Sequence, residues 1–518
     1  MLYLAFIYHM HQPYYKNLLT RVTEMPWVRL HGIKDYLDMV QILEKYPAIH
    51  QTFNFVPSLL EQIEDYTNRA VEDKFLVLSY KPAQDLTGED KEFILENFFK
   101  IDKDQVIASH PRYYELYLNR LNKKEFSPQD YLDLQVWFNL AWTDPIFREN
   151  TPELKNLTLK ARFFSEEEKR LVLDKQIEIL EDIIPAYKKF MASGQIELTI
   201  SPYYHPILPL LYSTKIAKEA NIKTILPKIN FAYPQDARIQ IEQAVKFYQD
   251  RFTTPLAGMW PSEESVSEHI LPFIIQSGIN WIVTDEVILF KSRKAKKRDT
   301  KLLYQPHLLK REEGNLNIVF RDRNLSDLIG FVYHGLKTEL AVEDFMKHLE
   351  NIAAGFKEQD ILVTVAMDGE NAWEYYPNDG HDFLDLLYKK LSEAKFLKTT
   401  TIKEYLQTHK PVSEIKRLAA GSWIYGDFGK WIGNPYKVKA WEWLAKAREE
   451  LENPKSQIPN PKLELAYKQI YIAEGSDWFW WYGENHEDFD QLFRLHLANF
   501  YTLLGKDIPD YLSKPLTA

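Results

Sequence analysis

Short apolar runs that stop at charged residues dominate the hydrophobic pattern of this chain. The clearest run covers residues 361–367 and is followed at once by Asp368 and Glu370. Unbroken apolar runs of this length predict strands that are buried on both faces, as in a parallel sheet. Because Asp368-Gly369 is also an ordinary turn sequence, this run alone leaves open a reading in which the acids only form a turn.

The same pattern recurs along the chain, which favours a functional explanation. Further apolar runs end at polar or charged residues: 2–8 before His9, 52–56 before Pro57, 196–200 before Ser201, 255–260 before Pro261, 281–284 before Asp285 and 316–320 before Arg321. In α/β barrels and open α/β sheets, the carboxyl ends of parallel strands meet at the edge where catalysis takes place. We therefore expect these polar residues to converge on one site.

Helical segments separate the predicted strands. Ser165 and Glu168 have capping-box spacing, apolar residues follow at helical intervals, and Gly194 provides a stop. Alternating strands and helices indicate an α/β fold. We predict a catalytic barrel over residues 1–410, with a helical insertion at about 59–190, and a mainly helical C-terminal domain over 411–518 that contributes to the active-site cleft. Lys410-Pro411 is the nearest sequence to that boundary that breaks helices and strands.

Composition narrows the class of protein. The 518 residues carry a formal net charge of -10, which argues against nucleic acid or an anionic membrane as a partner. The chain has no cysteine, so disulfides, thiolate nucleophiles and cysteine-ligated metals are excluded, and a reducing compartment is favoured. The apolar run at the N-terminus is too short for a signal peptide or a membrane span. We expect a cytoplasmic protein.

Aromatic residues gather beside the acids at the predicted strand ends. The chain has 13 Trp and 31 Tyr. Flat apolar ring faces suit the C–H faces of sugars, and polar ring tips suit a wet cleft. Carbohydrate is therefore the predicted substrate class, although each ring taken singly also fits a place in the core. The rings in question are Tyr203, Tyr204, Trp260, Trp373, Tyr375, Tyr376, Trp423, Trp431, Trp478, Trp480 and Trp481.

Candidate carboxyl groups for glycosidic bond cleavage stand at several strand ends. The reaction needs one carboxyl that protonates the leaving oxygen and one that attacks carbon 1 or activates water. Glu263, its neighbour Glu264, Asp285 and Asp368 all qualify by position. Their spacing does not choose among them.

Five short segments, taken in order, resemble the sequence regions of a known family. They are His11-Gln12-Pro13, Gly194-Gln195-Ile196-Glu197, Trp260-Pro261-Ser262-Glu263, Met367-Asp368-Gly369-Glu370-Asn371-Ala372-Trp373 and Ala440-Trp441. In this order they resemble the regions of glycoside hydrolase family 57, which contains α-amylases, amylopullulanases, branching enzymes and 4-α-glucanotransferases. The resemblance spans most of the chain.

The resemblance implies a (β/α)7 barrel, a helical domain that helps to wall the cleft, and a retaining mechanism on α-glucosidic bonds. It implies Glu263 as the nucleophile and Asp368 as the acid/base, with no cofactor and no metal ion. His11, Glu197 and Trp441 are implied to bind or position sugar. The full set of predicted substrate-binding residues is His11, Gln12, His31, Glu197, His205, Trp260, Asp285, Glu370, Trp373, Trp423, Trp441 and Asp477.

The roles implied for Glu263 and Asp368 lead us to expect that one of the two carboxyls is protonated near neutral pH. Retaining enzymes hold their two carboxyls about 5–5.5 Å apart, so that repulsion raises one pKa. We therefore expect Asp368 to hold the proton near neutral pH and Glu263 to be ionised. Glu264 departs from the family, in which a small residue is expected after the nucleophile.

The flanking sequence indicates which members of the family this chain resembles most. Residues 26–31, 421–424 and 476–481 are most similar to the amylase and amylopullulanase branch. The expected partner is an α-glucan or maltooligosaccharide substrate, with α-1,4 and possible α-1,6 specificity. A 4-α-glucanotransferase or a branching enzyme on the same scaffold is the alternative.

Two other classes of protein stay open at this stage. A glucan-binding protein without catalysis would need one of the two carboxyls to be missing, and both are present. A zinc-dependent mannosidase or deacetylase on a related barrel would use a metal site of imidazoles and acids. The His9-x-His11 pair does not come with the His-x-Asp or Asp-Asp strand-end motif that such a site leads us to expect. Its candidate ligands are His9, His11, His31, His205, Asp285 and Asp368.

Overall fold

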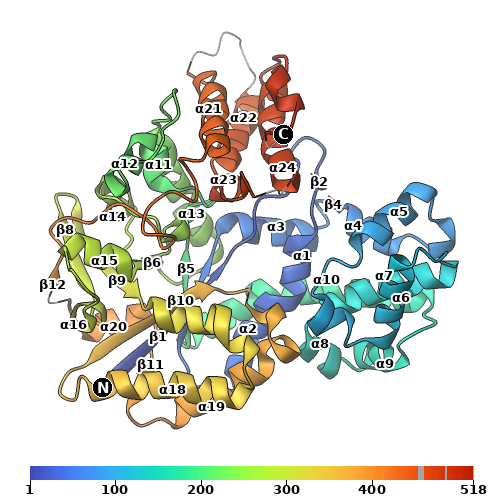
Figure 1. Cartoon of the computed structure of the whole chain (residues 1–518), viewed down its shortest axis with the longest axis horizontal. Helices are drawn as coiled ribbons and strands as arrows, with labels where there is room; N and C mark the ends of the chain where they lie inside the picture. Colours follow the sequence, from blue (N-terminus) through green and yellow to red (C-terminus); the bar gives the residue numbers. More distant parts are fainter. Residues whose placement is uncertain (371, 412, 453–459, 485–486, 517–518) are drawn as a thin grey trace.

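The computed structural model describes residues 1–370, 372–411, 413–452, 460–484 and 487–516 (Figure 1). Its centre is a closed barrel of parallel strands. They pair in chain order, and the final strand closes the ring by pairing with β1. The predicted seven-stranded barrel is confirmed. Its strands are β1 (Leu2–Met10), β3 (Gln51–Phe55), β5 (Ile196–Ile200), β6 (Gly258–Met259), β7 (Trp281–Asp285), β9 (Gly314–Arg321) and β10 (Ile361–Asp368).

Short additional strands lie beside the barrel wall. β8 (His307–Arg311) forms an antiparallel pair with β9, and β12 (Ser413–Glu414) extends it. β11 (Leu397–Thr399) pairs with the first residues of β1, at the amino end of the barrel. A separate two-stranded sheet consists of β2 (Val22–Thr23) and β4 (Glu72–Asp73).

Helices follow the strands and cover the outside of the barrel (Figure 1). They are α1 (Trp27–His31), η1 (Gly32–Tyr36), α2 (Leu37–Gln41) and η2 (Ile42–Lys45) after β1; α3 (Pro57–Thr67) and α10 (Glu166–Ala192) between β3 and β5; α11 (Leu208–Tyr212), η5 (Thr214–Ile216), α12 (Ala217–Ala220) and α13 (Pro234–Arg251) after β5; η6 (Ser262–Glu264), η7 (Glu268–Ile270) and α14 (Leu271–Gln276) after β6; α15 (Glu286–Arg293) and α16 (Thr300–Leu303) after β7; α17 (Arg323–Asp327), η8 (Leu328–Val332), η9 (Tyr333–Gly335) and α18 (Thr338–Ala354) after β9; and η10 (Trp373–Tyr375), η11 (Pro377–Gly380), α19 (His381–Glu393) and α20 (Ile402–Thr408) after β10.

The long helix α10 shows how local sequence sets the boundaries of these helices. It begins with the predicted capping box: the Ser165 side chain accepts from the backbone N–H of Glu168, and the Glu168 carboxylate accepts from the backbone N–H of Ser165 at 2.7 Å. The helix stops before Gly194, whose φ of +80° suits glycine. The chain then enters β5.

The barrel interior is filled by alternate side chains of its strands, because successive residues of a strand face opposite sides. Small and branched residues such as Ala5, Ile7 and Val283 share this interior with Trp281. Helix α20 closes the amino end, where Tyr405 belongs to the same apolar cluster. The chemistry is thereby confined to the opposite, carboxyl end.

A helical lobe projects from one side of the barrel, at the right of Figure 1. Buried Arg29 of α1 ties it to the barrel, because its guanidinium donates to Asp73 at 3.0 Å, to Asn139 at 2.9 Å and to Gln176 at 2.8 Å. This lobe lies within the predicted insertion. It contains α4 (Lys74–Tyr80), η3 (Ala83–Asp85), α5 (Gly88–Asn97), η4 (Lys103–Ile107), α6 (Pro111–Leu121), α7 (Pro128–Trp142), α8 (Pro145–Asn150) and α9 (Pro152–Lys160).

C-terminal helices pack above the carboxyl end of the barrel, at the top of Figure 1. The segment before them still belongs to the barrel surface, because Gly421 bridges to Val266. This contact favours a domain boundary nearer residue 435 than residue 411. Among the residues that the structure describes, we find no helix with the length and apolarity needed to cross a membrane. The C-terminal helices are α21 (Pro435–Glu449), α22 (Asn460–Ala473), α23 (Ser476–Trp481), α24 (Glu487–Leu503) and η12 (Asp510–Ser513).

Candidate active site

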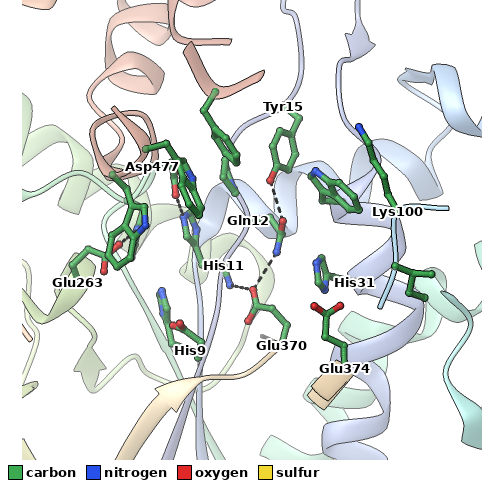
Figure 2. A pocket seen from close by; sticks show the side chains of 18 of the residues that line it. His9, His11, Gln12, Tyr15, His31, Lys100, Glu263, Glu370, Glu374 and Asp477 are labelled. Atoms are coloured by element: carbon green, nitrogen blue, oxygen red, sulfur yellow. Dashed lines mark hydrogen bonds and ion pairs between the residues drawn. The ribbon is translucent and has the colours of Figure 1, made fainter. Parts of the chain in front are cut away.

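A pocket of about 570 Å³ opens at the carboxyl end of the barrel (Figure 2). Three parts of the chain line it: the barrel, the helical insertion and the C-terminal helices. Its walls are mixed in character, because carboxylates, imidazoles and indole rings all contribute to the lining. The lining includes His9, His11, Gln12, Tyr15, Trp27, His31, Lys100, Asp102, Trp142, His205, Glu263, Asp368, Glu370, Glu374, Trp423, Asp477, Trp480 and Trp481.

Glu263 occupies a strained turn directly after β6. Its φ of 56° lies in the left-handed region, which is uncommon for a residue with a side chain. The carboxylate accepts a hydrogen bond from Trp423 Nε1 at 2.9 Å and one from Ser476 Oγ at 3.4 Å, and His205 Nδ1 lies 4.0 Å away. Burial and the negative charge of Asp368 raise the pKa of Glu263 to about 8, against the lowering effect of the Trp423 hydrogen bond.

Asp368 ends β10, where the strand pairs with β1 and places Asp368 beside His9 in register. The next residue anchors the turn, because the Gly369 backbone N–H donates to the His9 carbonyl at 2.7 Å. A Cβ atom on Gly369 would meet the end of the Met10 side chain, which would have to move to make room for it. The chain therefore leaves the strand at Gly369, and the catalytic role of Asp368 stays a prediction. Asn371 of the same motif lies outside the described residues.

Three imidazoles form the floor of the pocket. The rings of His9 and His205 stack with centroids 4.9 Å apart, and those of His11 and His205 lie 4.0 Å apart. His11 Nε2 is 2.7 Å from a carboxylate oxygen of Asp477. Burial and the neighbouring imidazole of His11 lower the pKa of His9 to about 3, and the same causes lower the pKa of His205 well below its usual value. His9 and His205 are therefore neutral at pH 7.

A hydrogen-bonded chain connects Glu370 through Gln12 to the buried side chain of Tyr15 (Figure 2). Glu370 accepts from the backbone N–H of His11 at 2.9 Å and from Gln12 Nε2 at 3.4 Å. The hydroxyl of Tyr15 in turn donates to Gln12 Oε1 at 3.1 Å. Burial and the charge of Asp368 raise the pKa of Glu370 well above its usual value. Gln12 and Glu370 thus present fixed polar groups to whatever fills the pocket.

The wall opposite Glu263 comes from the first barrel loop and from the insertion. The indoles of Trp27 and Trp142 lie 5.8 Å apart there, and the ring of His31 meets Trp142 edge-on at 5.5 Å. Lys100 and its neighbours in the insertion complete this side. Sequence patterns did not indicate Lys100, Asp102 or Trp142, because nothing in the insertion marks its residues as neighbours of the barrel mouth. Glu374 of η10, after β10, was not indicated either.

The sequence profile of glycosyl hydrolase family 57 matches residues 5–417, which is most of this chain. The chain belongs to glycoside hydrolase family 57. Alpha-amylase 1 of Dictyoglomus thermophilum is 25% identical over 264 residues, which are 50% of this chain and 33% of that protein. The chain thus spans about one third of the length of this relative.

Solved structures of family 57 enzymes share the fold. A branching enzyme from Thermococcus kodakaraensis has 15% sequence identity and a TM-score of 0.64, with 99% of this chain and 93% of that chain covered. An α-amylase from Thermotoga maritima has 16% identity and a TM-score of 0.58, with 97% and 92% covered. At these identities the likeness concerns the fold and not the individual activity.

Most of the site residues predicted for this family 57 chain line the pocket. The other predicted site residues do not line it: Glu197, Trp260, Asp285, Trp373 and Trp441. Glu197 stands at the start of β5, near the amino end of the barrel, where it accepts from Trp281 Nε1 and from the backbone N–H of Lys403, each at 2.9 Å. The residues in the pocket are Glu263, Asp368, His11, Gln12, His31, His205, Glu370, Trp423 and Asp477.

Asp285 is also removed from the pocket. It ends β7 as predicted, but its carboxylate caps α15 and forms ion pairs with Arg321 at 3.2 Å and with Arg323 at 2.7 Å. Trp441 lies inside the C-terminal domain, stacked on Phe479 with a centroid distance of 4.3 Å. Both side chains are fully buried. The structure therefore corrects the prediction that Asp285 and Trp441 line the cleft.

Two tryptophans that were predicted to bind substrate, Trp260 and Trp373, pack against residues at the strand ends instead of lining the pocket. The fully buried ring of Trp260 stacks on His9 at 4.8 Å and meets the ring of Trp423 edge-on at 5.6 Å. Trp373 donates from Nε1 to the carbonyl of Gly369 at 2.7 Å, next to Asp368. Neither ring lines the pocket, and substrate binding by these two residues stays a prediction.

The imidazole and acid set of the zinc-enzyme hypothesis is only partly assembled. Asp285 is engaged with arginines, and His31 Nδ1 lies 2.7 Å from Asp35 on the far wall. The imidazoles of His11 and His205 instead meet Asp477, and their ligand atoms lie within 4.8 Å of one another. Membership of a glycoside hydrolase family favours the reading in which Glu263 and Asp368 do the chemistry.

Proposed function

We propose that this family 57 enzyme is a retaining glycoside hydrolase that cleaves α-glucosidic bonds of α-glucans, of the amylase or amylopullulanase type. The observation that supports it most directly is the placement of Glu263 and Asp368 in one cleft, close enough for the charge of one to raise the pKa of the other. Repulsion of this kind is expected of the carboxyl pair of a retaining enzyme. Indole rings around the pair suit the apolar faces of glucose units.

In the proposed reaction, Asp368 protonates the glycosidic oxygen while ionised Glu263 attacks carbon 1. The sugar is then covalently held by Glu263, and Asp368 takes a proton from the water that releases it. Burial raises the pKa of Glu263 to about 8, which disfavours the ionised nucleophile near neutral pH. We infer that the pair shares one proton in the free cleft, and that attack requires this proton to reside on Asp368. It stays a prediction that Asp368, and not Glu263, holds this proton near neutral pH.

Sugar hydroxyls have matched polar groups along the cleft. Gln12, Glu370 and Asp477 offer amide and carboxylate groups that are already held by hydrogen bonds within the protein. Trp27 and Trp142 on one side and Trp480 on the other offer ring faces. Fixed polar groups and rigid rings bind a sugar with little loss of side-chain entropy.

Transfer to another sugar is the second candidate, as 4-α-glucanotransferase or branching enzyme. The fold shared with the branching enzyme of Thermococcus kodakaraensis supports transfer as an alternative to hydrolysis. Chromatography of the products from maltooligosaccharides and from pullulan tests both candidates. Hydrolysis releases one new reducing end for each bond broken, whereas transfer produces longer or branched chains with no net gain of reducing ends. Release of maltotriose from pullulan would add α-1,6 activity, because α-1,6 bonds join its maltotriose units. Failure to act on any of these substrates would contradict the proposal.

We propose an α-glucan or maltooligosaccharide as the substrate and the cytoplasm as the place of action. The absence of cysteine suits a reducing compartment. The formal net charge of -10 disfavours nucleic acid as a partner.

Turnover should not depend on a metal ion in the catalytic pocket. We expect the initial rate on maltooligosaccharides, measured well below the unfolding temperature, to survive exhaustive dialysis against a chelator. The reason is that the proposed chemistry uses two carboxyls and neutral imidazoles only. A loss of rate that zinc restores at that temperature would support the site formed by His11, His205 and Asp477 instead.

Removal of the hydrogen bond to Glu263 should shift the pH profile. Trp423→Phe keeps an aromatic ring and deletes the N–H that lowers the pKa of Glu263. Because Glu263 must be ionised, we expect the acidic limb of kcat/KM to move upward by about one pH unit, the equivalent of about 1.4 kcal/mol.

Trp441→Phe is the matched control for that variant. It removes a buried indole N–H that donates to the carbonyl of Trp431 at 3.1 Å, away from the pocket. This change should lower the unfolding temperature and leave the acidic limb in place. Equal profiles for the two variants would show that Trp423 has only a structural role.

A further inference from the structure

Three buried metal-ligating side chains meet outside the catalytic pocket. Asp38 lies on α2 of the barrel, Asp144 precedes α8 of the insertion as its cap, and His381 begins α19. Their ligand atoms all lie within 4.8 Å of one another. None of the three lines the pocket that contains Glu263 and Asp368. We call this set the Asp38 cluster.

The carboxylate of Asp38 lacks a donor among the described residues. Its side chain is 4% exposed, and Oδ1 is buried without a hydrogen-bond partner. Asp144 is better satisfied, since it accepts from the backbone N–H of Ile146 at 2.7 Å and faces His381 Nε2 at 2.8 Å. A buried carboxylate beside a second one is unfavourable unless a proton or a cation is supplied. Burial and the charge of Asp144 accordingly raise the pKa of Asp38 well above its usual value.

Carboxylates outnumber cationic side chains around the cluster, so a bound cation would balance part of the negative charge. Lys34 contacts Asp35 and Asp379, and Arg148 lies near Asp144 and Asp379. His31 Nδ1 lies 2.7 Å from Asp35. Burial lowers the pKa of His381, but the hydrogen bond to Asp144 and the charge of Asp144 outweigh it and raise this pKa to about 9, so a metal ion must displace the proton of this imidazole. Once His381 is neutral, the cations of Lys34 and Arg148 fall two charges short of the four carboxylates, and one divalent ion supplies that charge. The groups concerned are the carboxylates of Asp35, Asp38, Asp144 and Asp379 and the cations of Lys34 and Arg148.

We propose that Asp38, Asp144 and His381 bind one divalent transition-metal ion, such as zinc, that fastens the helical insertion to the barrel. Two carboxylate oxygens and one imidazole nitrogen suit zinc or manganese, whereas magnesium and calcium prefer ligand sets made of oxygen. The site is independent of the proposed function, since it lies outside the catalytic pocket.

The geometry needs only small side-chain movements. Zinc–ligand distances of about 2.0–2.2 Å in a tetrahedron place ligand atoms about 3.4 Å apart. The 2.8 Å between His381 Nε2 and Asp144 Oδ2 must therefore widen by about half an ångström. A surface hollow lined by Pro145, Ile146 and His381 gives access from solvent, so a water molecule is available as the fourth ligand.

Zinc content tests this assignment directly. Untagged protein is stripped with a chelator, dialysed against zinc, freed of excess by gel filtration and analysed by mass spectrometry of the metal. We compare the native chain with Asp38→Asn, which removes a ligand charge at constant size, and with Asp477→Asn, which alters the other imidazole cluster. We expect the native chain and Asp477→Asn to retain one zinc ion that Asp38→Asn lacks. No zinc in the native chain, or equal zinc in Asp38→Asn, would overturn the proposal.

Thermal unfolding gives a second readout. An ion that binds only the folded chain raises the unfolding temperature, so zinc should raise it by several degrees in the native chain, while magnesium should not. Neither Asp38→Asn nor His381→Gln should respond to zinc. Because Asn removes an unpaired buried charge, Asp38→Asn should be at least as stable as the chelated native chain. An unfolding temperature of the native chain that zinc does not raise would show that a proton satisfies Asp38.

Discussion

Glu263→Gln should reduce turnover on maltooligosaccharides by roughly 10³-fold to 10⁶-fold, the range expected when a covalent catalyst loses its nucleophile. The amide keeps the size of the side chain and can still accept the hydrogen bond from Trp423. It cannot attack carbon 1. Initial rates measured on the same folded samples check the prediction.

Glu264→Gln is the matched control. Both carboxylate oxygens of Glu264 are buried without hydrogen bonds among the described residues, and burial raises its pKa well above the usual value, which favours the neutral form that the amide imitates. We expect a rate loss of less than about tenfold. If Glu264→Gln proved the more damaging change, the nucleophile would have to be reassigned to the neighbouring residue.

Glu263→Gln should raise the free energy of unfolding near pH 8, although it lowers turnover. Because the pKa of Glu263 rises from its ordinary value to about 8 on folding, the native chain loses stability as pH increases from about 4.5 to about 8. This loss amounts to roughly 1.4 kcal/mol for each unit of pKa difference. The amide does not ionise. The free energy of unfolding of Glu263→Gln should therefore exceed that of the native chain at pH 8 by more than at pH 5, as urea titrations at both pH values will show.

Asp368→Asn should produce the second large loss, and one that depends on the leaving group. Hydrolysis of a maltooligosaccharide needs the proton that Asp368 donates, and we expect turnover to fall by roughly 10²-fold to 10⁴-fold. An α-maltotriosyl fluoride needs much less help from an acid, so formation of the glycosyl-enzyme should be affected far less. The ratio of the two rates measures the role of Asp368 as the acid.

Azide provides the complementary test of the two carboxyls. In Asp368→Asn it should attack the glycosyl-enzyme without help from a base and release an α-glycosyl azide. In Glu263→Ala it should instead attack the substrate directly and release a β-glycosyl azide. These configurations follow from two displacements in one case and one in the other. A β product from Asp368→Asn would contradict the retaining mechanism.

The barrel and the floor of the cleft could be predicted from sequence because they depend on strand ends. His9, Glu263 and Asp368 each come where an apolar run stops, and parallel pairing brings such ends together. Glu197 shows the limit of the family resemblance. It stands at the second position of β5, so the strand-end argument itself places it at the other end of the barrel.

Other features depend on tertiary contacts that no local pattern reveals. Asp285 ends a strand, but two arginines and the start of α15 take its carboxylate out of the cleft. Trp142 reaches the cleft only because buried Arg29 holds the insertion against the first barrel loop. The raised pKa of Glu263 likewise depends on burial that separate parts of the chain create.

The hydrogen bonds to Glu263 have a consequence for biosynthesis. Trp423 and Ser476 reach this carboxylate from positions 160 and 213 residues further along the chain. A ribosome that has released all seven barrel strands has therefore not yet released the groups that adjust the pKa of Glu263. Contacts between such distant segments form late in folding. A nascent chain should accordingly remain unable to digest glucan until its C-terminal helices have docked, so the appearance of activity marks the end of assembly.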